Sequence, residues 1–212
     1  MAHPLNWVLV DPHAVDVWMV ELDKPRPAVL TPEERARAAR FRFEADRRHW
    51  SNARCALRVI LSRYVGTLPE GIRFTFGPHG KPATEGIEFN LSHARNWGAI
   101  AVSYTIPVGI DIESIRDNVE MDVLLRRIGE TQIHGPKEHL FQIWTRREAR
   151  TKALGCPLME IPPADVIATD IVAPAGFAAS VALINRAPQV SYCGGAESYD
   201  YLRVSRPNDR KL

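Results

Sequence analysis

The sequence predicts an α+β fold made of two similar halves, and three observations support this. First, the expected elements run strand, helices, strands in the first half of the chain and repeat that order in the second. Second, 212 residues can form two small units of about 100 residues each. Third, 45% hydrophobic and 25% charged residues provide an ordinary globular core that needs no disulfide scaffold. We place the halves at residues 1–106 and 107–212 and expect a functional site at their interface, because ligand clefts favour such junctions.

The N-terminal half is predicted to contain two helices between strands. Thr31-Pro32-Glu33-Glu34 is a typical helix start, because the threonine can cap the helix, proline is favoured in its first turn and Glu34 can complete a capping box. Apolar residues at helical spacing predict a second, longer helix, which Gly66 would end. The expected ranges are strand 15–22, helix 32–41, helix 45–64, strand 72–76, a rigid loop at 77–82, strand 89–92 and strand 97–104.

The C-terminal half follows the same scheme. The pentapeptide Gly109-Ile110-Asp111-Ile112-Glu113 is expected to form its first strand, shortly after Pro107. Pro136 predicts the start of a long helix and Gly155 its end, because proline is tolerated only in the first turn and glycine favours the position after the last. The expected ranges are strand 109–113, helix 119–128, helix 136–154, and strands 165–170, 179–185 and 198–204.

Two acids share one face of the pentapeptide strand. Side chains alternate along a strand, so Asp111 and Glu113 point to one side and the two isoleucines to the other. At about 3.3 Å of rise per residue, the two acidic Cα atoms lie roughly 6–7 Å apart. Neighbouring carboxylates repel each other unless a cation neutralises them, and Mg²⁺ prefers oxygen ligands. The alternation therefore predicts either a magnesium site or an edge strand with a solvated acidic face.

Three residues on the long helix leave a similar choice open. Trp144, Glu148 and Lys152 follow one another at intervals of four residues and so share one face of the helix. Glu148 and Lys152 can form an ordinary helical ion pair beside a core tryptophan. Alternatively, Glu148 supplies a third oxygen ligand beside the acidic strand, and Lys152 meets a phosphate one turn further on. The second arrangement would suit metal-assisted phosphoryl transfer.

Charge and cysteine content argue against several classes of function. The formal net charge of +2 and the lack of an aromatic stacking motif argue against a nucleic-acid binder. Eight arginines crowd into residues 35–58 among acidic residues, as on solvated helices with i,i+4 pairs, although one or two of them could bind phosphate. The sequence contains no recognisable signal peptide or membrane span, and its three cysteines lack ligand-like spacing. We therefore expect a cytoplasmic protein with reduced thiols and no membrane partner.

Three separated motifs resemble those of one enzyme family. Gly80-Lys81-Pro82 followed by Phe89-Asn90-Leu91-Ser92-His93 resembles its G-K-P and N-[IL]-S-H segments. Residues 109–113 resemble its G-[IV]-D-[IV]-E segment, and residues 144–152 resemble its W-x-x-K-E-[AS]-x-x-K segment. The motifs occur in the family's order. The chain thus resembles the two-halved 4′-phosphopantetheinyl transferases that activate the carrier proteins of peptide and polyketide synthetases.

This resemblance implies a fold, a reaction and a partner. Members of the family are pseudo-twofold α+β proteins that bind coenzyme A with Mg²⁺ between their halves. They move phosphopantetheine from coenzyme A to a serine hydroxyl of an acyl, peptidyl or polyketide carrier protein and release adenosine 3′,5′-bisphosphate. Because two similar halves form one cleft, a monomer is the simplest expectation.

The resemblance also implies roles for individual residues. The expected magnesium ligands are Asp111, Glu113 and Glu148. The expected catalytic residues are Asp111, Glu148, which would activate the serine hydroxyl, and Lys152, which would contact the pyrophosphate. Without the motif, His93 would be taken for an ordinary turn histidine. The expected coenzyme A contacts are Arg37, Lys81, Asn90, Ser92, His93 and Lys152.

Three features depart from the family pattern, and the last two lie in the region that receives the carrier protein in relatives. Arg147 stands where relatives have lysine, which keeps the charge but changes the donor geometry. Residues 128–135 depart from the usual Phe-x-x-x-Glu pattern, and the interval between Glu113 and Glu148 is short for the family. The alternative function is therefore a non-catalytic coenzyme A-binding or carrier-docking module, although all three acids and Lys152 are present.

Overall fold

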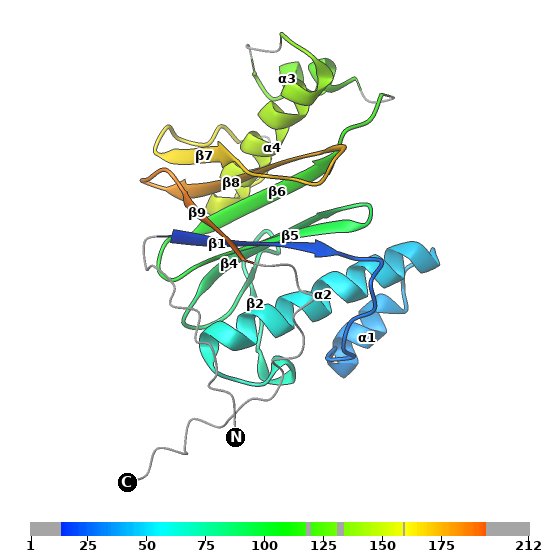
Figure 1. Ribbon diagram of the computed structural model, residues 1–212. Helices are drawn as coiled ribbons and strands as arrows, with labels where there is room; N and C mark the ends of the chain where they lie inside the picture. The colour runs from blue at the N-terminus through cyan, green and yellow to red at the C-terminus, as the bar shows by residue number, and fades with distance from the viewer. Residues whose placement is uncertain (1–13, 118–119, 131–133, 159, 194–212) are drawn as a thin grey trace.

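Two β-sheets packed face to face form the centre of the protein, and one long helix covers the outer face of each (Figure 1). The computed structural model describes residues 14–117, 120–130, 134–158 and 160–193. The strand order is β4-β5-β1-β9 in the first sheet and β6-β8-β7 in the second. The layers are thus helix α2, first sheet, second sheet and helix α4. This confirms the mixed α+β class, while the twofold relation between the halves stays a prediction.

The first sheet contains one strand that the sequence did not predict. β1 (Ala14–Glu21) and β4 (Glu88–Ala94) each pair antiparallel with β5 (Trp97–Ser103), close to the expected ranges. β9 (Gln189–Cys193) pairs parallel with β1, so a strand from the C-terminal half completes the sheet of the N-terminal half. The strand expected at 198–204 lies outside the described residues. The division at residues 106 and 107 stays a prediction.

Helix α1 (Pro32–Ala38) begins as the sequence predicts. The Thr31 hydroxyl accepts a hydrogen bond from the backbone N–H of Glu34, and the Glu34 carboxylate accepts one from the N–H of Thr31. This is the predicted capping box, although the helix ends three residues earlier than expected. The strand expected at 72–76 is shorter than predicted. Only β2 (Thr75–Phe76) forms a paired strand there, with β3 (Pro82–Ala83) beyond the loop, and a 3₁₀ turn, η1 (Pro69–Gly71), precedes it.

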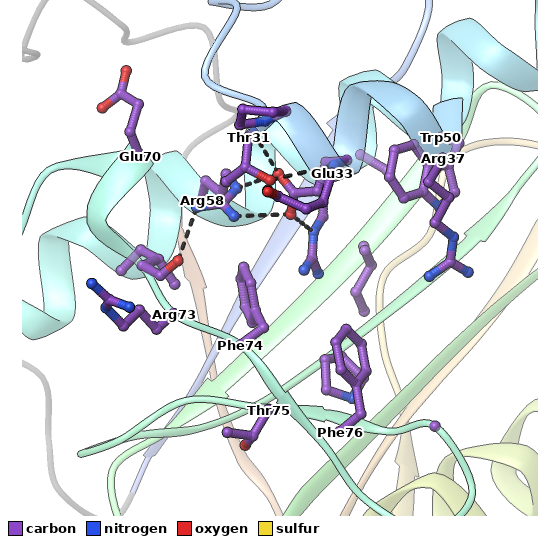
Figure 2. Close-up of a pocket in the computed structure, with 18 of the residues that line it drawn as sticks. Thr31, Glu33, Arg37, Trp50, Arg58, Glu70, Arg73, Phe74, Thr75 and Phe76 are labelled. Carbon is purple, nitrogen blue, oxygen red and sulfur yellow. Dashed lines mark hydrogen bonds and ion pairs between the residues drawn. The ribbon is translucent and has the colours of Figure 1, made fainter. Parts of the chain in front are cut away.

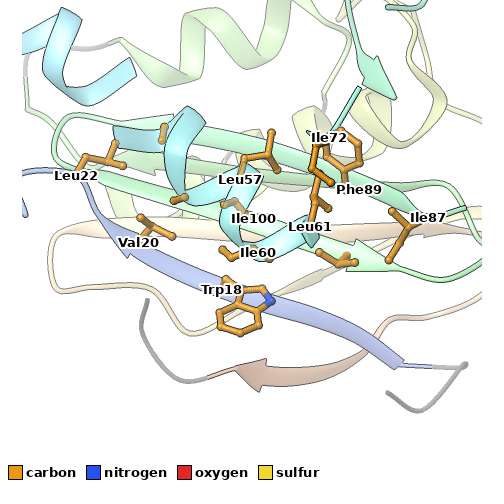
Figure 3. Packing of buried hydrophobic residues seen from close by; sticks show 13 residues of the cluster. Trp18, Val20, Leu22, Leu57, Ile60, Leu61, Ile72, Ile87, Phe89 and Ile100 are labelled. Carbon is orange, nitrogen blue, oxygen red and sulfur yellow. The ribbon is translucent and has the colours of Figure 1, made fainter. Parts of the chain in front are cut away.

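Helix α2 (Glu44–Val65) covers the outer face of the first sheet. It ends at Gly66, whose positive φ of 67° suits glycine, as predicted. Its apolar face packs on alternate residues of β1 and β5 (Figure 3). The cluster includes Trp18, Val20, Leu57, Ile60, Leu61, Phe89 and Ile100.

The second sheet lies between the first sheet and helix α4. β6 (Val108–Ser114) and β7 (Val166–Asp170) each pair antiparallel with β8 (Phe177–Ile184). α3 (Met121–Arg127) and α4 (Lys137–Leu154) follow β6, and Gly155 ends α4 with a φ of 68°, as predicted. No helix among the described residues is long and apolar enough to cross a membrane. The three cysteines are free thiols, as predicted.

A buried aspartate on β1 is tied to helix α2. The Tyr64 hydroxyl donates a hydrogen bond of 2.7 Å to Asp16 and accepts one of 3.0 Å from the Trp18 indole. Burial raises the pKa of the Asp16 carboxyl above its ordinary value of 3.8, although hydrogen bonds from Tyr64 and Cys193 oppose the shift. The folded protein therefore binds a proton at Asp16 more tightly than the unfolded chain does.

The raised pKa of Asp16 predicts how substitutions of Asp16 and of Tyr64 affect the stability of the protein. As the pH rises from 3.8 through the raised pKa, the free energy of unfolding falls, because folding then buries a charged carboxylate. We expect Asp16→Asn to flatten this pH dependence without lowering stability at neutral pH. Tyr64→Phe should lower stability by about 1–3 kcal/mol, because it leaves a buried carboxylate without its donor. Urea unfolding of both variants across the pH range measures this, and a more stable Tyr64→Phe protein would contradict it.

Candidate active site

Helix α4 lies directly on the backbone of β6, and Gly109 makes this possible. A Cβ atom at Gly109 would lie 2.0 Å from the carbonyl oxygen of Ala149 and 2.4 Å from the nitrogen of Ala153. These are backbone atoms of α4, so no side-chain rotation could relieve the clash. The glycine of the pentapeptide therefore allows the helix that carries Glu148 and Lys152 to approach the strand that carries Asp111.

The two acids of β6 face this helix. Ile110 and Ile112 pack in the core between the two sheets, so Asp111 and Glu113 point to the α4 side, as the alternation predicts. Asp111 is only 1% exposed, whereas Glu113 is half-buried. The interpretation as a solvated acidic face therefore fails at Asp111, because the helix covers it.

Lys152 connects the acids of the strand and the helix. Its ammonium group lies 2.5 Å from Asp111 Oδ1 and 3.1 Å from Glu148 Oε2. Glu148 and Lys152 thus form the helical ion pair that the sequence allowed, but the pair also reaches across to the strand. Trp144, on the same helix face, packs partly against the core cluster beneath α3. The structure therefore brings together Asp111, Glu148 and Lys152.

The electrostatics of this cluster show an excess of negative charge. Burial raises the pKa of the Glu113 carboxyl to about 7, and the neighbouring Asp111 and Glu148 carboxylates add to the shift. Burial also raises the pKa of Glu148, with Lys152 opposing it. Burial alone would lower the pKa of Lys152, but Asp111 and Glu148 outweigh it and raise it. The Asp111 carboxylate therefore makes both Glu113 and Glu148 harder to ionise.

The donor atoms of this cluster fit a hard divalent cation. Asp111 Oδ2 is buried without a hydrogen-bond partner among the described residues, and the raised pKa of Glu113 signals missing positive charge. Carboxylate oxygens are the ligands that Mg²⁺ prefers. In the described part of the chain, however, no three acidic, histidine or cysteine side chains are already arranged to hold an ion. Instead, the Lys152 ammonium group bridges Asp111 and Glu148.

Asn90 and Ser92, on β4, connect the two sheets. The Asn90 side-chain oxygen accepts a hydrogen bond of 2.9 Å from the backbone N–H of Ile110 and so satisfies a donor on the free edge of β6. The Ser92 hydroxyl donates to Asp111 Oδ1 at 2.8 Å and accepts from Lys152 at 3.2 Å. Both side chains are buried. They position the acidic strand, and their predicted contacts with coenzyme A stay predictions.

Lys81 lies at the end of helix α4. Its ammonium group donates to the carbonyl oxygens of Val108 and Ala153 at 3.1 and 3.2 Å. A cation is favoured there, because carbonyl groups without helical partners give the C-terminus of a helix partial negative charge. Burial lowers the pKa of Lys81. Its predicted role at the nucleotide end of coenzyme A stays a prediction, since in this structure it joins the 77–82 loop to α4.

A large pocket lies between the two N-terminal helices and the β2–β3 hairpin (Figure 2). Its volume is about 1030 Å³. Figure 2 shows Arg37 and Trp50 on the helix side of the pocket and Phe74 and Phe76 on the opposite side. The pocket therefore combines aromatic walls with cationic side chains, and the acids Glu33, Glu34 and Glu70 also line it. The cationic side chains are Arg37, Arg54, Arg58 and Arg73, with His93 on β4.

Two of the pocket arginines are held by Glu34. Arg54 Nε donates to this carboxylate at 2.5 Å, and the Arg58 guanidinium group donates to both of its oxygens at 2.7 and 2.9 Å. The Arg54 guanidinium group also lies 3.7 Å from the centre of the Phe74 ring. The expectation of solvated helical pairs therefore fails for Arg54 and Arg58, which join α1 to α2 across the pocket wall. Arg37, predicted from the family pattern, does line the pocket.

Several pocket residues were missed by the sequence analysis. Arg54, Arg73 and the aromatic residues of the lining carry no motif of their own. The available signal was the alternation of Arg73 and Thr75 with Phe74 and Phe76, which indicated a strand with two different faces. From the sequence alone, this alternation predicted only the strand at 72–76.

His93 places the pocket beside the acidic cluster. It lines the pocket, and its neighbour Ser92 points to the opposite side of β4 and contacts Asp111. Burial lowers the pKa of the His93 imidazole, and the charges of His49 and Lys152 lower it further. His93 belongs to β4 and precedes the turn, so it is no turn histidine. The aromatic and cationic pocket thus adjoins the cluster of Asp111, Glu148 and Lys152.

Comparisons with known proteins agree on one family. Residues 24–105 match the family model described as 4′-phosphopantetheinyl transferase, N-terminal. The 4′-phosphopantetheinyl transferase HetI of Nostoc sp. is 33% identical over 176 residues, which cover 73% of this chain and 74% of HetI. The transferases psf-1 of Bacillus pumilus and AcpT of Salmonella typhimurium are 33% and 34% identical, but the matches cover only 57% and 61% of their lengths and 58% and 51% of this chain. The chain therefore belongs to the 4′-phosphopantetheinyl transferase family of enzymes.

Proposed function

We propose that this enzyme transfers the 4′-phosphopantetheine group of coenzyme A to a serine hydroxyl of an acyl, peptidyl or polyketide carrier protein. The reaction would depend on Mg²⁺ and release adenosine 3′,5′-bisphosphate. The observation that carries the proposal is that three acids and Lys152 converge beside a pocket lined by cationic and aromatic side chains. Such a site suits a polyanionic substrate with a flat base.

The pocket would receive the nucleotide end of coenzyme A. Arg37 and His93 can donate hydrogen bonds to phosphate, and guanidinium groups suit phosphate because they bind it through two parallel bonds. The aromatic side chains of Trp50, Phe74 and Phe76 offer flat surfaces to an adenine ring. His93 then marks the side of the pocket from which the pyrophosphate would reach the acidic cluster.

The acidic cluster would carry out the transfer. Asp111, Glu113 and Glu148 would hold the Mg²⁺ ion, which when bound would neutralise their charge and polarise the pyrophosphate. The serine hydroxyl would form a bond to the phosphorus on the pantetheine side while the P–O bond to the adenosine side breaks. Glu148 would accept the serine proton, directly or through a water molecule. Lys152 would stabilise the negative charge of the departing bisphosphate.

A mass measurement tests this proposal. We expect an apo carrier protein, incubated with the enzyme, coenzyme A and Mg²⁺, to gain the mass of one phosphopantetheine group, and we expect a chelator to prevent the gain. A panel of acyl, peptidyl and polyketide carrier domains would identify the substrate class. Calorimetric binding of coenzyme A without any mass gain across the panel would instead favour the alternative of a non-catalytic binding or docking module.

A further inference from the structure

We propose that Lys152 occupies the cation position of the acidic cluster in the ligand-free protein and competes with a divalent metal ion for Asp111 and Glu148. This inference rests on the proposed function, because it concerns the same three acids. It adds a second role for Lys152, which would offset part of the charge of the acids and then move to the phosphate. Lys152 would change from the contact with the acids to the contact with the phosphate when the metal ion and coenzyme A bind.

The contacts of the Lys152 ammonium group support the first role. Its nitrogen lies 2.5 Å from Asp111 Oδ1, 3.1 Å from Glu148 Oε2 and 3.2 Å from Ser92 Oγ. These three oxygens come from β6, α4 and β4, so the ammonium group joins all the elements that build the cluster. An ammonium group in these contacts takes oxygen donors that a metal ion would also need.

Lys152 offsets only part of the negative charge of the three acids. Its single positive charge faces two carboxylates, and the third, Glu113, forms its one ion pair among the described residues with the half-exposed Arg116, at 3.5 Å. Asp111 Oδ2 stays buried without a hydrogen-bond partner in the described part of the chain. A divalent cation would therefore offset more of the negative charge than the lysine does, but it cannot share Asp111 with an ammonium group without strong repulsion.

The Lys152 side chain can move away from the acids. It is 29% exposed, so it is not fixed in the core, and its four rotatable bonds allow the ammonium group to change position. Its charge already acts on His93, which lines the neighbouring pocket. A pyrophosphate arriving from that pocket would supply the negative charge that draws Lys152 away from Asp111 as the metal ion enters.

Metal binding to the free enzyme tests this inference without any transfer reaction. Mn²⁺ alone, at about pH 8, well above the ordinary pKa of carboxyl groups, can be titrated and the free ion followed by electron paramagnetic resonance. We expect Lys152→Met to bind Mn²⁺ at least about tenfold more tightly than the wild type, which corresponds to about 1.4 kcal/mol. Lys152→Arg keeps the competing charge and should bind no more tightly than the wild type.

A second lysine of the same helix provides the matched control. Lys137, in the first turn of α4, pairs with the exposed Asp117 and lies outside the cluster. Lys137→Met should leave the Mn²⁺ affinity unchanged. A thermal scan gives an independent readout. Because Lys152→Met leaves the acids uncompensated, Mg²⁺ should raise its melting temperature more than that of the wild type.

The outcomes separate this inference from the proposed function. If Lys152→Met binds Mn²⁺ with wild-type or weaker affinity, or if neither protein binds it, Lys152 does not compete with metal. The proposed function would still stand if the wild type modifies a carrier protein in Mg²⁺. Conversely, if Lys152→Met binds Mn²⁺ more tightly and the wild type transfers phosphopantetheine to no carrier protein, the competition stands and the proposed reaction is refuted.

Discussion

Asp111→Asn is expected to lower the rate of phosphopantetheine transfer at least about 100-fold, because the site loses its most buried negative charge. The amide keeps the size of the side chain, and its oxygen can still accept hydrogen bonds from Ser92 and Lys152. The variant therefore removes charge with little change of shape. The rate at which a carrier protein gains mass measures the effect, and circular dichroism verifies that the variant is folded.

The matched control for this variant is Asp16→Asn. Asp16 is also a buried strand aspartate, at 2% exposure, but it lies on β1 and accepts a hydrogen bond from Tyr64, away from the acidic cluster. We expect Asp16→Asn to transfer phosphopantetheine at the wild-type rate. A folded Asp111→Asn protein with a wild-type rate would refute the catalytic role of Asp111. Glu148→Gln provides a second, independent loss of a cluster carboxylate.

Gly109→Ala is expected to lower the free energy of unfolding by about 3 kcal/mol or more, at the upper end of the cost of overpacking. The added methyl group would collide with backbone atoms of Ala149 and Ala153, so helix α4 must move away from β6. That movement would separate Lys152 and Glu148 from Asp111, and transfer should be lost in whatever protein still folds. Urea unfolding and the mass-gain assay measure the two effects.

A second strand glycine shows whether the effect depends on this contact. Gly98, on β5, is also buried, but a Cβ atom there would lie 3.4 Å from the nearest atom, on the side chain of Leu22, which is an ordinary contact distance. We expect Gly98→Ala to change stability by no more than about 1 kcal/mol. If Gly109→Ala were as stable as Gly98→Ala, α4 would not depend on the missing side chain at position 109.

Local signals predicted most of the elements correctly because they act over short stretches of chain. The capping box at Thr31 and the helix-ending glycines Gly66 and Gly155 concern groups within one or two turns. The segment at 72–76 was predicted too long, since only Thr75 and Phe76 pair with the far side of the loop. β9 was missed because its strand exists through pairing with β1, at the other end of the chain.

The sequence alone determined the family, the alternation that puts Asp111 and Glu113 on one face, and the helix that carries Glu148 and Lys152. These features depend on residues that are neighbours along the chain. Only the tertiary structure decided that Asp111 is buried rather than solvated, and that Lys152 rather than solvent neutralises it. The reason is distance along the chain. Lys152 meets Asp111 across 41 residues and Ser92 across 60, and these contacts form only when Gly109 lets α4 settle on β6.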